Sequence, residues 1–292
     1  MIIVNLKGGL GNQMFQYACG RALSLRNGEI LKMDISGFAR TSTSDTPRVY
    51  SLSEFNIASN TIASEKEIQK LKYPYSIISK GWRFIKAKIS REGNIGWNKH
   101  IFSKTGTVYL DGFWQTEKYF SDCKNTIRQE FTLKNPLGSE ARVIAGKVGT
   151  DRVSPLSPSV AIHIRRGDVA RDAKKNLYYG ICTTEYYANA LAYMAKRLGN
   201  FRVFIFSDDI DWVKENMLIN QPVTYISGKM TDCEELILMS MCNHAIIANS
   251  SFSWWGAWLN KNPQKIILAP KEWITKAHYR HKDTVPPSWI RI

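Results

Sequence analysis

The apolar and polar positions near the N-terminus follow the order strand, glycine turn, helix. Ile2–Leu6 is a short apolar run, and Lys7-Gly-Gly-Leu-Gly11 follows it. Apolar side chains then recur at helical spacing: Phe15, Ala18, Ala22 and Leu25. This order predicts a Rossmann-like βα unit. Met14 stands where the third glycine of a dinucleotide fingerprint belongs, so an NAD site is not expected.

The second half of the chain repeats a strand–helix rhythm more plainly. Four apolar runs read as buried strands: Val160–Ile164, Val203–Phe206, Ala245–Ala248 and Lys265–Leu268. Three helical patterns separate them: Tyr186–Arg197, Ile210–Asn216 and Glu234–Cys242. Buried strands that alternate with helices predict an α/β fold with a doubly wound parallel sheet.

Between these halves the pattern is less regular. Val108–Thr116 reads as a strand and turn that lead to a helix through Tyr119 and Ile127. The stretch 134–159 reads as a helix with glycine- and proline-bearing linkers on both sides. We therefore expect two domains, 1–155 and 156–292, both Rossmann-like.

The segment 66–104 is basic and carries interleaved aromatic residues. Within it, Ile78, Trp82, Ile85 and Ile89 share one helical face, and Lys80, Arg83 and Lys86 lie elsewhere. Such a helix suits peripheral contact with an anionic membrane. A surface helix docked on its own domain, with solvated lysines around it, also fits the pattern and is the interpretation we favour.

Composition narrows the class of protein. The 292 residues are 44% hydrophobic and 22% charged, as in globular chains, and the formal net charge is +15. This charge favours anionic partners such as nucleic acid, a nucleotide sugar or a membrane surface. The five cysteines are scattered without a C-x-x-C pair, and the apolar runs are too short for a signal core or membrane span. We therefore expect a cytoplasmic protein without disulfides or structural zinc.

Polar clusters follow three successive strands of the second half. His163-Ile-Arg165-Arg166-Gly-Asp168 spans the end of the first of them, with Arg165 directly after the strand. Because parallel strands end at the same edge of a sheet, we expect these clusters to meet there. Arginine pairs with phosphate through a planar fork, so Arg165 suits a diphosphate. Arg166 faces the other side if the strand continues, and His163 alone would fit a buried core position.

The other two clusters support the same chemistry. Asn249, Ser250 and Ser251 precede a helix that starts near Phe252, and a helix N-terminus with serine hydroxyls suits phosphate. The same residues would also serve as an ordinary helix cap. Asp208 and Asp209 follow the Val203–Phe206 strand. With Asp211 they form either a metal chelate or, as we favour, a metal-free contact to a nucleoside.

Four blocks together resemble the bacterial α-1,2-fucosyltransferases of glycosyltransferase family 11. In chain order they are Gly8-Gly-Leu-Gly-Asn-Gln-Met-Phe-Gln-Tyr17, Asp111-Gly-Phe-Trp-Gln-Thr-Glu-Lys-Tyr-Phe120, His163-Ile-Arg-Arg-Gly-Asp168 and Asn249-Ser-Ser-Phe-Ser-Trp-Trp-Gly-Ala-Trp258. The resemblance implies a GT-B fold, with two Rossmann-like domains facing each other across a cleft. Domain 1–155 would bind mainly the acceptor and domain 156–292 the donor, GDP-fucose.

The resemblance also implies a reaction: inverting transfer of L-fucose to the 2-hydroxyl of a galactosyl residue, without a metal or other cofactor. Arg165 would pair with the donor β-phosphate beside His163, and Asp208 or Asp209 would lie near the guanosine. The remaining donor-side residues would be Arg166, Asn249, Ser250, Ser251 and Phe252. Asn12, Gln13, Asp111 and Trp114 would lie on the acceptor side of the cleft. For the catalytic base, Asp168 comes first, with Asp111 and Asp172 behind it.

The acceptor implied is a galactose-terminated oligosaccharide, free or lipid-linked, in a bacterial surface polysaccharide such as an O antigen. Two other functions stay open at the level of sequence. One is a metal-dependent glycosyltransferase that uses another nucleotide sugar. The other is a basic nucleic-acid-binding protein, against which stand the lack of a recognised module and the distance of the basic segment from the strand-end clusters.

Overall fold

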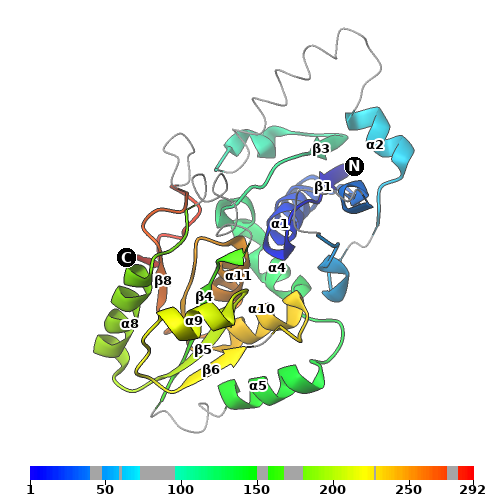
Figure 1. Cartoon of the computed structure of the whole chain (residues 1–292). Helices are drawn as coiled ribbons and strands as arrows, with labels where there is room; N and C mark the ends of the chain where they lie inside the picture. The colour runs from blue at the N-terminus through cyan, green and yellow to red at the C-terminus, as the bar shows by residue number, and fades with distance from the viewer. Residues whose placement is uncertain are drawn as a thin grey trace. The chain divides into compact units, whose positions relative to one another are not determined.

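The computed structural model describes residues 1–39, 48–58, 61–72, 96–149, 157–167, 180–226, 228–274 and 282–292. The chain forms two compact units (Figure 1). Unit 1 is Met1–Lys134 with His278–Pro286, and unit 2 is Asn135–Ala277 with Pro287–Ile292.

The division falls after Lys134, earlier than the expected boundary at residue 155. Helix α5 (Ser139–Gly149) packs against helix α10 (Asp232–Met241) of unit 2. Just before α5, the Gly138 amide donates to the Glu234 carboxylate at 2.6 Å. These contacts attach the helix to unit 2, although the linkers around it look alike in sequence.

The described strands of unit 1 form a parallel sheet in the order β2-β1-β3. They are β1 (Ile2–Asn5), β2 (Leu31–Asp34) and β3 (Val108–Leu110). The α-helices are α1 (Leu10–Asn27), α2 (Glu65–Lys72) and α4 (Lys124–Glu130). Short 3-10 turns cover Ser36–Ala39, Leu52–Glu54, Lys99–Ser103, Glu117–Tyr119 and Ser121–Cys123.

Helix α1 confirms the predicted turn and helix at the N-terminus. Gly8 has a φ of +80°, a left-handed conformation that side chains rarely adopt, and Gly9 is the N-cap. A methyl group at Gly20 would lie 3.3 Å from the Val4 Cβ, so this glycine lets the helix approach β1 closely. Leu25, in the last turn, is 44% exposed and lies outside the core, contrary to the expected apolar face.

Unit 2 contains the predicted doubly wound parallel sheet, with described strands in the order β6-β5-β4-β7-β8-β9. They are β4 (Ser159–Ile164), β5 (Arg202–Ser207), β6 (Val223–Ile226), β7 (His244–Ile246), β8 (Ile267–Ala269) and β9 (Ile290–Arg291). Strand β4 is buried along its whole length. Strands β6 and β9 were not predicted, because one is mostly half-buried and the other consists of two exposed residues.

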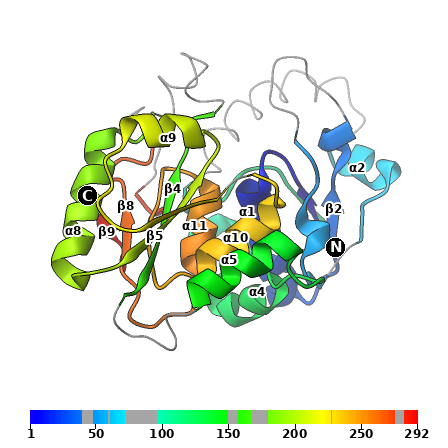
Figure 2. The same cartoon turned by 60° about the horizontal axis from the view of Figure 1, so that its bottom comes forward.

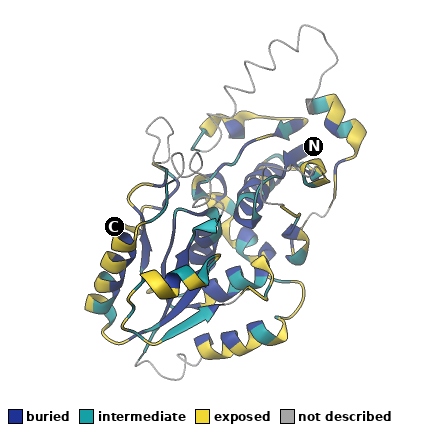
Figure 3. Cartoon of the chain, viewed as in Figure 1, coloured by how far each residue is buried: buried dark blue, intermediate teal, exposed yellow. Residues whose placement is uncertain are grey.

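Helices cover both faces of this sheet. Figure 2 shows α8 (Thr184–Leu198) and α9 (Ile210–Asn216) on one face, with α10 and α11 (Ser251–Leu259) on the other. Residues of α8 and α9 share one apolar core with alternate residues of β4 and β5. The strands are mostly buried, whereas the outer sides of the helices are exposed (Figure 3).

The tryptophan-rich helix α11 belongs to the core of unit 2. Trp254, Trp255 and Trp258 are all buried, and the rings of Trp254 and Trp258 stack with centroids 6.1 Å apart. Gly256 lies against Met239 of α10, where a methyl group would come within 2.5 Å of its Sδ. The aromatic side chains therefore pack α11 in place rather than line a surface.

Among the described residues, none of the helices has the length and apolar character needed to cross a membrane. The predicted amphipathic helix Ile78–Ile89 lies outside the described residues, as does most of the predicted linker before Ser159.

Candidate active site

The sheet of unit 2 changes direction between β4 and β7. From β4 the chain proceeds outward through β5 and β6, then crosses to β7 on the other side of β4. Open α/β sheets bind ligands beyond the carboxyl ends of the strands at such a position. We refer to the carboxyl ends of β4 and β7 as the unit-2 switch point. His163 and Arg165 lie at one side of it, and Asn249 and Ser250 at the other.

His163 is buried and electrically neutral at the unit-2 switch point. Its ring centroid lies 5.4 Å from that of Phe252, the second residue of α11. Burial and the nearby Arg165 charge lower the pKa of His163 to about 3. Within the described part of the chain, its Nδ1 atom is buried without a hydrogen-bond partner. The imidazole therefore adds hydrogen-bonding capacity to this site without adding charge.

Arg165 and the N-terminus of α11 place cationic character on both sides of the switch point. Arg165 is half-buried directly after β4. The Ser250 hydroxyl caps α11 by accepting from the Phe252 amide at 3.3 Å, and Ser251 starts the helix half-buried. A guanidinium and a helix N-terminus both stabilise phosphate oxygens. Both groups therefore suit a diphosphate, and the donor contact expected of Arg165, Ser250 and Ser251 stays a prediction.

Asn249 holds the loop between β7 and α11. Its amide nitrogen donates to the carbonyl oxygens of Gly180 at 3.2 Å and Trp273 at 3.4 Å. The Cys182 thiol donates to its side-chain oxygen at 3.6 Å. These bonds give Asn249 a structural part in the site, and the donor contact that we expected of it stays a prediction.

Arg166 does not share the environment of Arg165. Its guanidinium carbon lies 3.6 Å from the ring centroid of Trp212, and its Nε lies 3.6 Å from an Asp209 oxygen. We expected Arg166 and Asp209 on the donor; in the structure both make these contacts within unit 2, and their donor contact stays a prediction. Consecutive residues at a strand end point to opposite sides, which separates the two arginines. The sequence carried no signal for the Trp212 stack.

The aspartates after β5 serve the local fold. Asp209 caps α9 by accepting from the Trp212 amide at 3.3 Å. Asp208 accepts from the Arg166 amide at 2.8 Å and lies so close to Gly167 that a methyl group there would be 2.3 Å from its Oδ2. Asp211 pairs with Lys214 at 3.7 Å on the surface. Across the described ranges, no three potential metal ligands of the His, Cys, Asp and Glu types converge.

The predicted acceptor-side residues of unit 1 differ in burial: some are buried and hold the loops in place, and others are accessible to solvent. Gln13 is fully buried: it donates to the Gly8 and Val49 carbonyls and accepts from the Ser51 amide. It supports the glycine turn and does not reach outward as we had expected. Asn12, in the first turn of α1, is half-buried and accepts from the Gln115 side chain at 2.8 Å.

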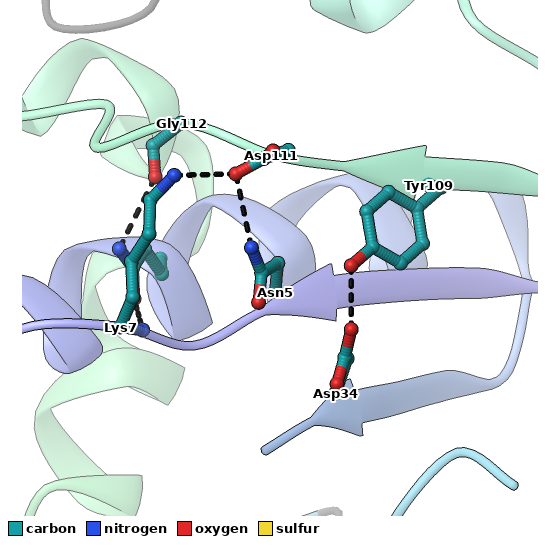
Figure 4. A network of polar contacts seen from close by, with 7 residues as sticks. Asn5, Lys7, Asp34, Tyr109, Asp111 and Gly112 are labelled. Atoms are coloured by element: carbon teal, nitrogen blue, oxygen red, sulfur yellow. Dashed lines mark hydrogen bonds and ion pairs between the residues drawn. The ribbon is translucent and has the colours of Figure 1, made fainter. Parts of the chain in front are cut away.

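Trp114 and Asp111 follow β3 but differ in accessibility. Trp114 is 1% exposed, so its side chain has almost no surface that could contact an acceptor. Its φ of +43° is a strained value for a bulky residue. Asp111 is exposed and accepts hydrogen bonds from Asn5, at 3.0 Å, and from Lys7 (Figure 4). We had not singled out Lys7; its place two residues after β1 was the available signal.

Two of the candidates for the catalytic base, Asp168 and Asp172, lie outside the described residues. Their part in the site stays a prediction.

Two units with open parallel sheets, one of which sets an arginine and a helix N-terminus at its switch point, match the GT-B fold of glycosyltransferases, which the solved structures below share. Within that class the chain belongs to glycosyl transferase family 11, whose family model matches residues 1–292. This confirms the resemblance seen in the four sequence blocks.

Relatives in the family include a glycosyltransferase of O-antigen biosynthesis. The chain is 35% identical to an α-1,2-colitosyltransferase of Escherichia coli, over 100% of this chain and 99% of that protein. It is 30% identical to the O-antigen biosynthesis glycosyltransferase WbnK of Escherichia coli, over 98% and 99%. Human galactoside α-(1,2)-fucosyltransferase 1 is 27% identical over 51% of this chain and 42% of its own length.

Solved structures with the same fold are distant in sequence. The NodZ α-1,6-fucosyltransferase soaked with GDP-fucose superposes with a TM-score of 0.51 at 16% identity, covering 91% of this chain and 94% of NodZ. A point mutant of Arabidopsis thaliana FUT1 in complex with GDP superposes with a TM-score of 0.52 at 12% identity, covering 94% and 71%. At these identities the likeness establishes the fold alone.

Proposed function

We propose that this family 11 glycosyltransferase moves L-fucose from GDP-fucose to the 2-hydroxyl of a galactosyl residue, with inversion, during assembly of a bacterial O antigen. The O-antigen and galactoside α-(1,2)-fucosyltransferase relatives support this choice of donor, linkage and pathway. The observation that carries it is the unit-2 switch point, where Arg165 and the α11 N-terminus lie beside the neutral His163.

The chemistry of transfer explains why these groups suit the proposal. Breaking the bond between fucose and phosphate builds negative charge on the departing GDP, while the sugar becomes oxocarbenium-like. A fixed guanidinium stabilises that growing charge more than it stabilises the intact donor, and this difference lowers the barrier. The amide groups at the start of α11 would act on the same oxygens.

Inversion also requires a group that accepts the proton of the acceptor hydroxyl. Asp168 remains our first candidate, with Asp111 and Asp172 behind it. An ionised carboxylate beside Arg165 would be a weak base, because a neighbouring positive charge lowers its pKa. Late deprotonation in a loose transition state would make a weak base sufficient.

One observation favours a second donor. The relative with 35% identity carries the name of a colitosyltransferase, and colitose is a 3-deoxy analogue of fucose. Both donors would present the same GDP leaving group to Arg165. The two sugars differ at one hydroxyl, so a donor site built to hydrogen-bond the 3-hydroxyl would strongly disfavour colitose.

A donor and acceptor panel tests the proposal directly. GDP-fucose and GDP-colitose would each be offered with a set of β-galactosides, and the linkage of any product would be determined by NMR. We expect α-1,2-linked fucose on galactose. Transfer of colitose alone would replace the proposal with the second donor, and transfer of neither sugar would refute both.

We further propose that transfer requires no metal ion. The carboxylates after β5 are already engaged in capping, a backbone contact and a surface ion pair, which supports this view. Full activity in excess EDTA is the expected result. Activity that is lost in EDTA and restored by Mn²⁺ would contradict it.

A further inference from the structure

We propose that Lys7 and Asp111 in unit 1 form a binding site for an uncharged, hydroxyl-rich ligand, and, resting on the proposed function, that this ligand is the galactosyl acceptor. The two residues form an ion pair at the carboxyl edge of the unit-1 sheet, and the ligand would contact both.

The topology of unit 1 selects this position. Strand β1 lies between β2 and β3, so the chain turns first to one side of β1 and later to the other. The carboxyl ends of β1 and β3 therefore form a second switch point, the kind of place where open sheets bind ligands. Lys7 follows β1 and Asp111 follows β3, and their side chains meet there (Figure 4).

The two loops that carry the pair are held by one buried amide. Gln16 of α1 is fully buried; its oxygen accepts from the Lys7 amide at 2.9 Å, and its nitrogen donates to the Gly112 carbonyl at 3.2 Å. A second bond joins Asn12 to Gln115 at 2.8 Å. A site whose loops are fixed in advance loses less entropy when it binds a ligand.

The same segment contains a strained residue. Trp114, three residues after Asp111, has a positive φ of 43° and is buried. Strain of this kind persists where the surroundings enforce it, and it clusters at ligand sites. Below the pair, Asn5 donates to Asp111 at 3.0 Å, and the Tyr109 hydroxyl donates to the buried Asp34, so polar contacts extend across all three strands (Figure 4).

The charges indicate which ligand fits. Lys7 and Asp111 form an ion pair, so together they carry no net charge, whereas a phosphate group requires excess positive charge. Both side chains remain accessible, with 33% and 47% of their surface exposed. The half-buried Phe113 ring lies 5.1 Å from the Lys7 Nζ. A hydrogen-bond donor, Lys7, and an acceptor, Asp111, therefore lie beside an aromatic ring. This combination matches a sugar, which has hydroxyl groups and an apolar C–H face.

Two conservative variants test the site. Asp111→Asn keeps the shape of the side chain, and Lys7→Met keeps most of the length of its chain. Because hydrogen bonds to charged groups are among the stronger ones, we expect each change to raise the KM for the galactoside roughly tenfold or more. The KM for GDP-fucose and the affinity for GDP should stay within about twofold, since unit 2 is unaltered.

Unit 1 supplies a matched control pair. Lys32 on β2 and Glu67 on α2 form an ion pair with 23% and 27% of their side chains exposed, away from the carboxyl ends of β1 and β3. Lys32→Met and Glu67→Gln should leave the KM for the galactoside unchanged. If the variants at Lys7 and Asp111 behave like these controls, the proposal is wrong. A rise in the KM for GDP-fucose instead would also overturn it.

Direct binding separates this proposal from the proposed function. Saturation-transfer NMR with a β-galactoside in the presence of GDP reports binding without any transfer. Loss of the galactoside signal in Asp111→Asn, with the signal kept in Glu67→Gln, supports the site even if fucose is not the sugar transferred. An unchanged signal in Asp111→Asn refutes the site even if wild-type protein transfers fucose.

Discussion

His163 and Arg165, two positions apart in unit 2, show how the chain gives neighbouring groups different electrical states. Arginine keeps its charge at any working pH. That charge, together with burial, lowers the pKa of His163 to about 3, so the imidazole stays neutral. The switch point thus pairs a permanent cation with a neutral hydrogen-bonding ring. We therefore do not expect His163 to titrate in the pH profile of activity near pH 6.5, the ordinary pKa of this side chain.

Arg165 and Arg166 should respond differently to truncation. Arg165→Ala is expected to reduce turnover by about a hundredfold or more while leaving the unfolding midpoint nearly unchanged. Arg165→Lys should recover only part of the loss, because an ammonium lacks the planar fork. Steady-state kinetics and thermal unfolding of the same samples check this.

The matched control is Arg166→Ala. It removes the guanidinium that lies 3.6 Å from the Trp212 ring centroid, so it should lower the free energy of unfolding, by roughly 1–2 kcal/mol. Near-normal turnover in Arg165→Ala would remove this residue from the site. Unchanged stability in Arg166→Ala would contradict the structural part that we assign to the stack.

At this scale, the sequence predicted what depends on chain order and missed what depends on distant contacts. His163 lies next to the last residue of a buried strand, and Arg165 and Ser250 follow buried strands. This position in the chain alone predicted that they share one sheet edge. Lys7 and Asp111 are separated by 104 positions in the chain. Their contact depends on the pairing of β1 with β3, which local patterns do not reveal.

The close packing of helices α10 and α11 depends on one small residue, Gly256. A methyl group at Gly256 would come within 2.5 Å of the Met239 Sδ and 3.2 Å of its Cβ. Met239 is buried and cannot move aside freely. We therefore expect Gly256→Ala to lower the free energy of unfolding by about 1–3 kcal/mol, as overpacked cores do.

Gly146 in α5 provides the comparison, because, among the described residues, a methyl group built there would meet nothing within 4 Å beyond its chain neighbours and its own helix backbone. Gly146→Ala should stabilise the protein by up to about 1 kcal/mol through helix propensity alone. Urea unfolding of both variants measures the difference. Equal effects at the two glycines would show that close packing at Gly256 is not what the helix pair requires.

The contact between α5 and α10 should make stability depend on pH. Burial, with the charges of Asp232 and Glu140, raises the pKa of the Glu235 carboxyl from 4.5 to about 7. Between these values the unfolded chain binds fewer protons than the folded protein, so the free energy of unfolding should fall as pH rises from about 4.5 to about 7. Urea unfolding across this range should show a smaller fall for Glu235→Gln. An identical slope in both proteins would contradict the assignment.

The sequence predicted elements best where apolar runs are long. The strands β4 and β5 and the helices α1, α8 and α9 were expected close to their observed bounds. Strands β2, β6 and β9 are short, and their pairing partners rather than their own patterns define them. Helix α5 was expected as a helix, but its attachment to unit 2 comes from contacts with α10 and not from the linkers beside it.

On the scale of the whole molecule, the two units repeat one arrangement with different chemistry. Each has a parallel sheet whose strand order reverses direction, and each carries polar side chains at that point. The C-terminal part of the chain contributes residues to both units. Asp283 pairs with Lys118 in unit 1, and β9 then pairs with β8 in unit 2. The sequence predicted two Rossmann-like domains, because a strand, glycine turn and helix open the first half and a strand–helix rhythm repeats in the second.

If unit 2 binds the donor and unit 1 the acceptor, as we propose, the two ligands should slow amide hydrogen exchange in different parts of the chain. GDP alone should slow exchange of amides in unit 2, around His163–Arg166 and Ser250–Ser253, because fixed phosphate contacts suppress local opening there. Addition of a β-galactoside to the GDP complex should slow exchange around Lys7–Gly9 and Asp111–Gln115 in unit 1. Arg165→Ala should lose the first effect, because its diphosphate contact is missing, and Asp111→Asn should lose the second alone. Protection by GDP that is confined to unit 1 would show that the nucleotide binds at the other switch point, and the assignment of donor and acceptor to the two units would then be reversed.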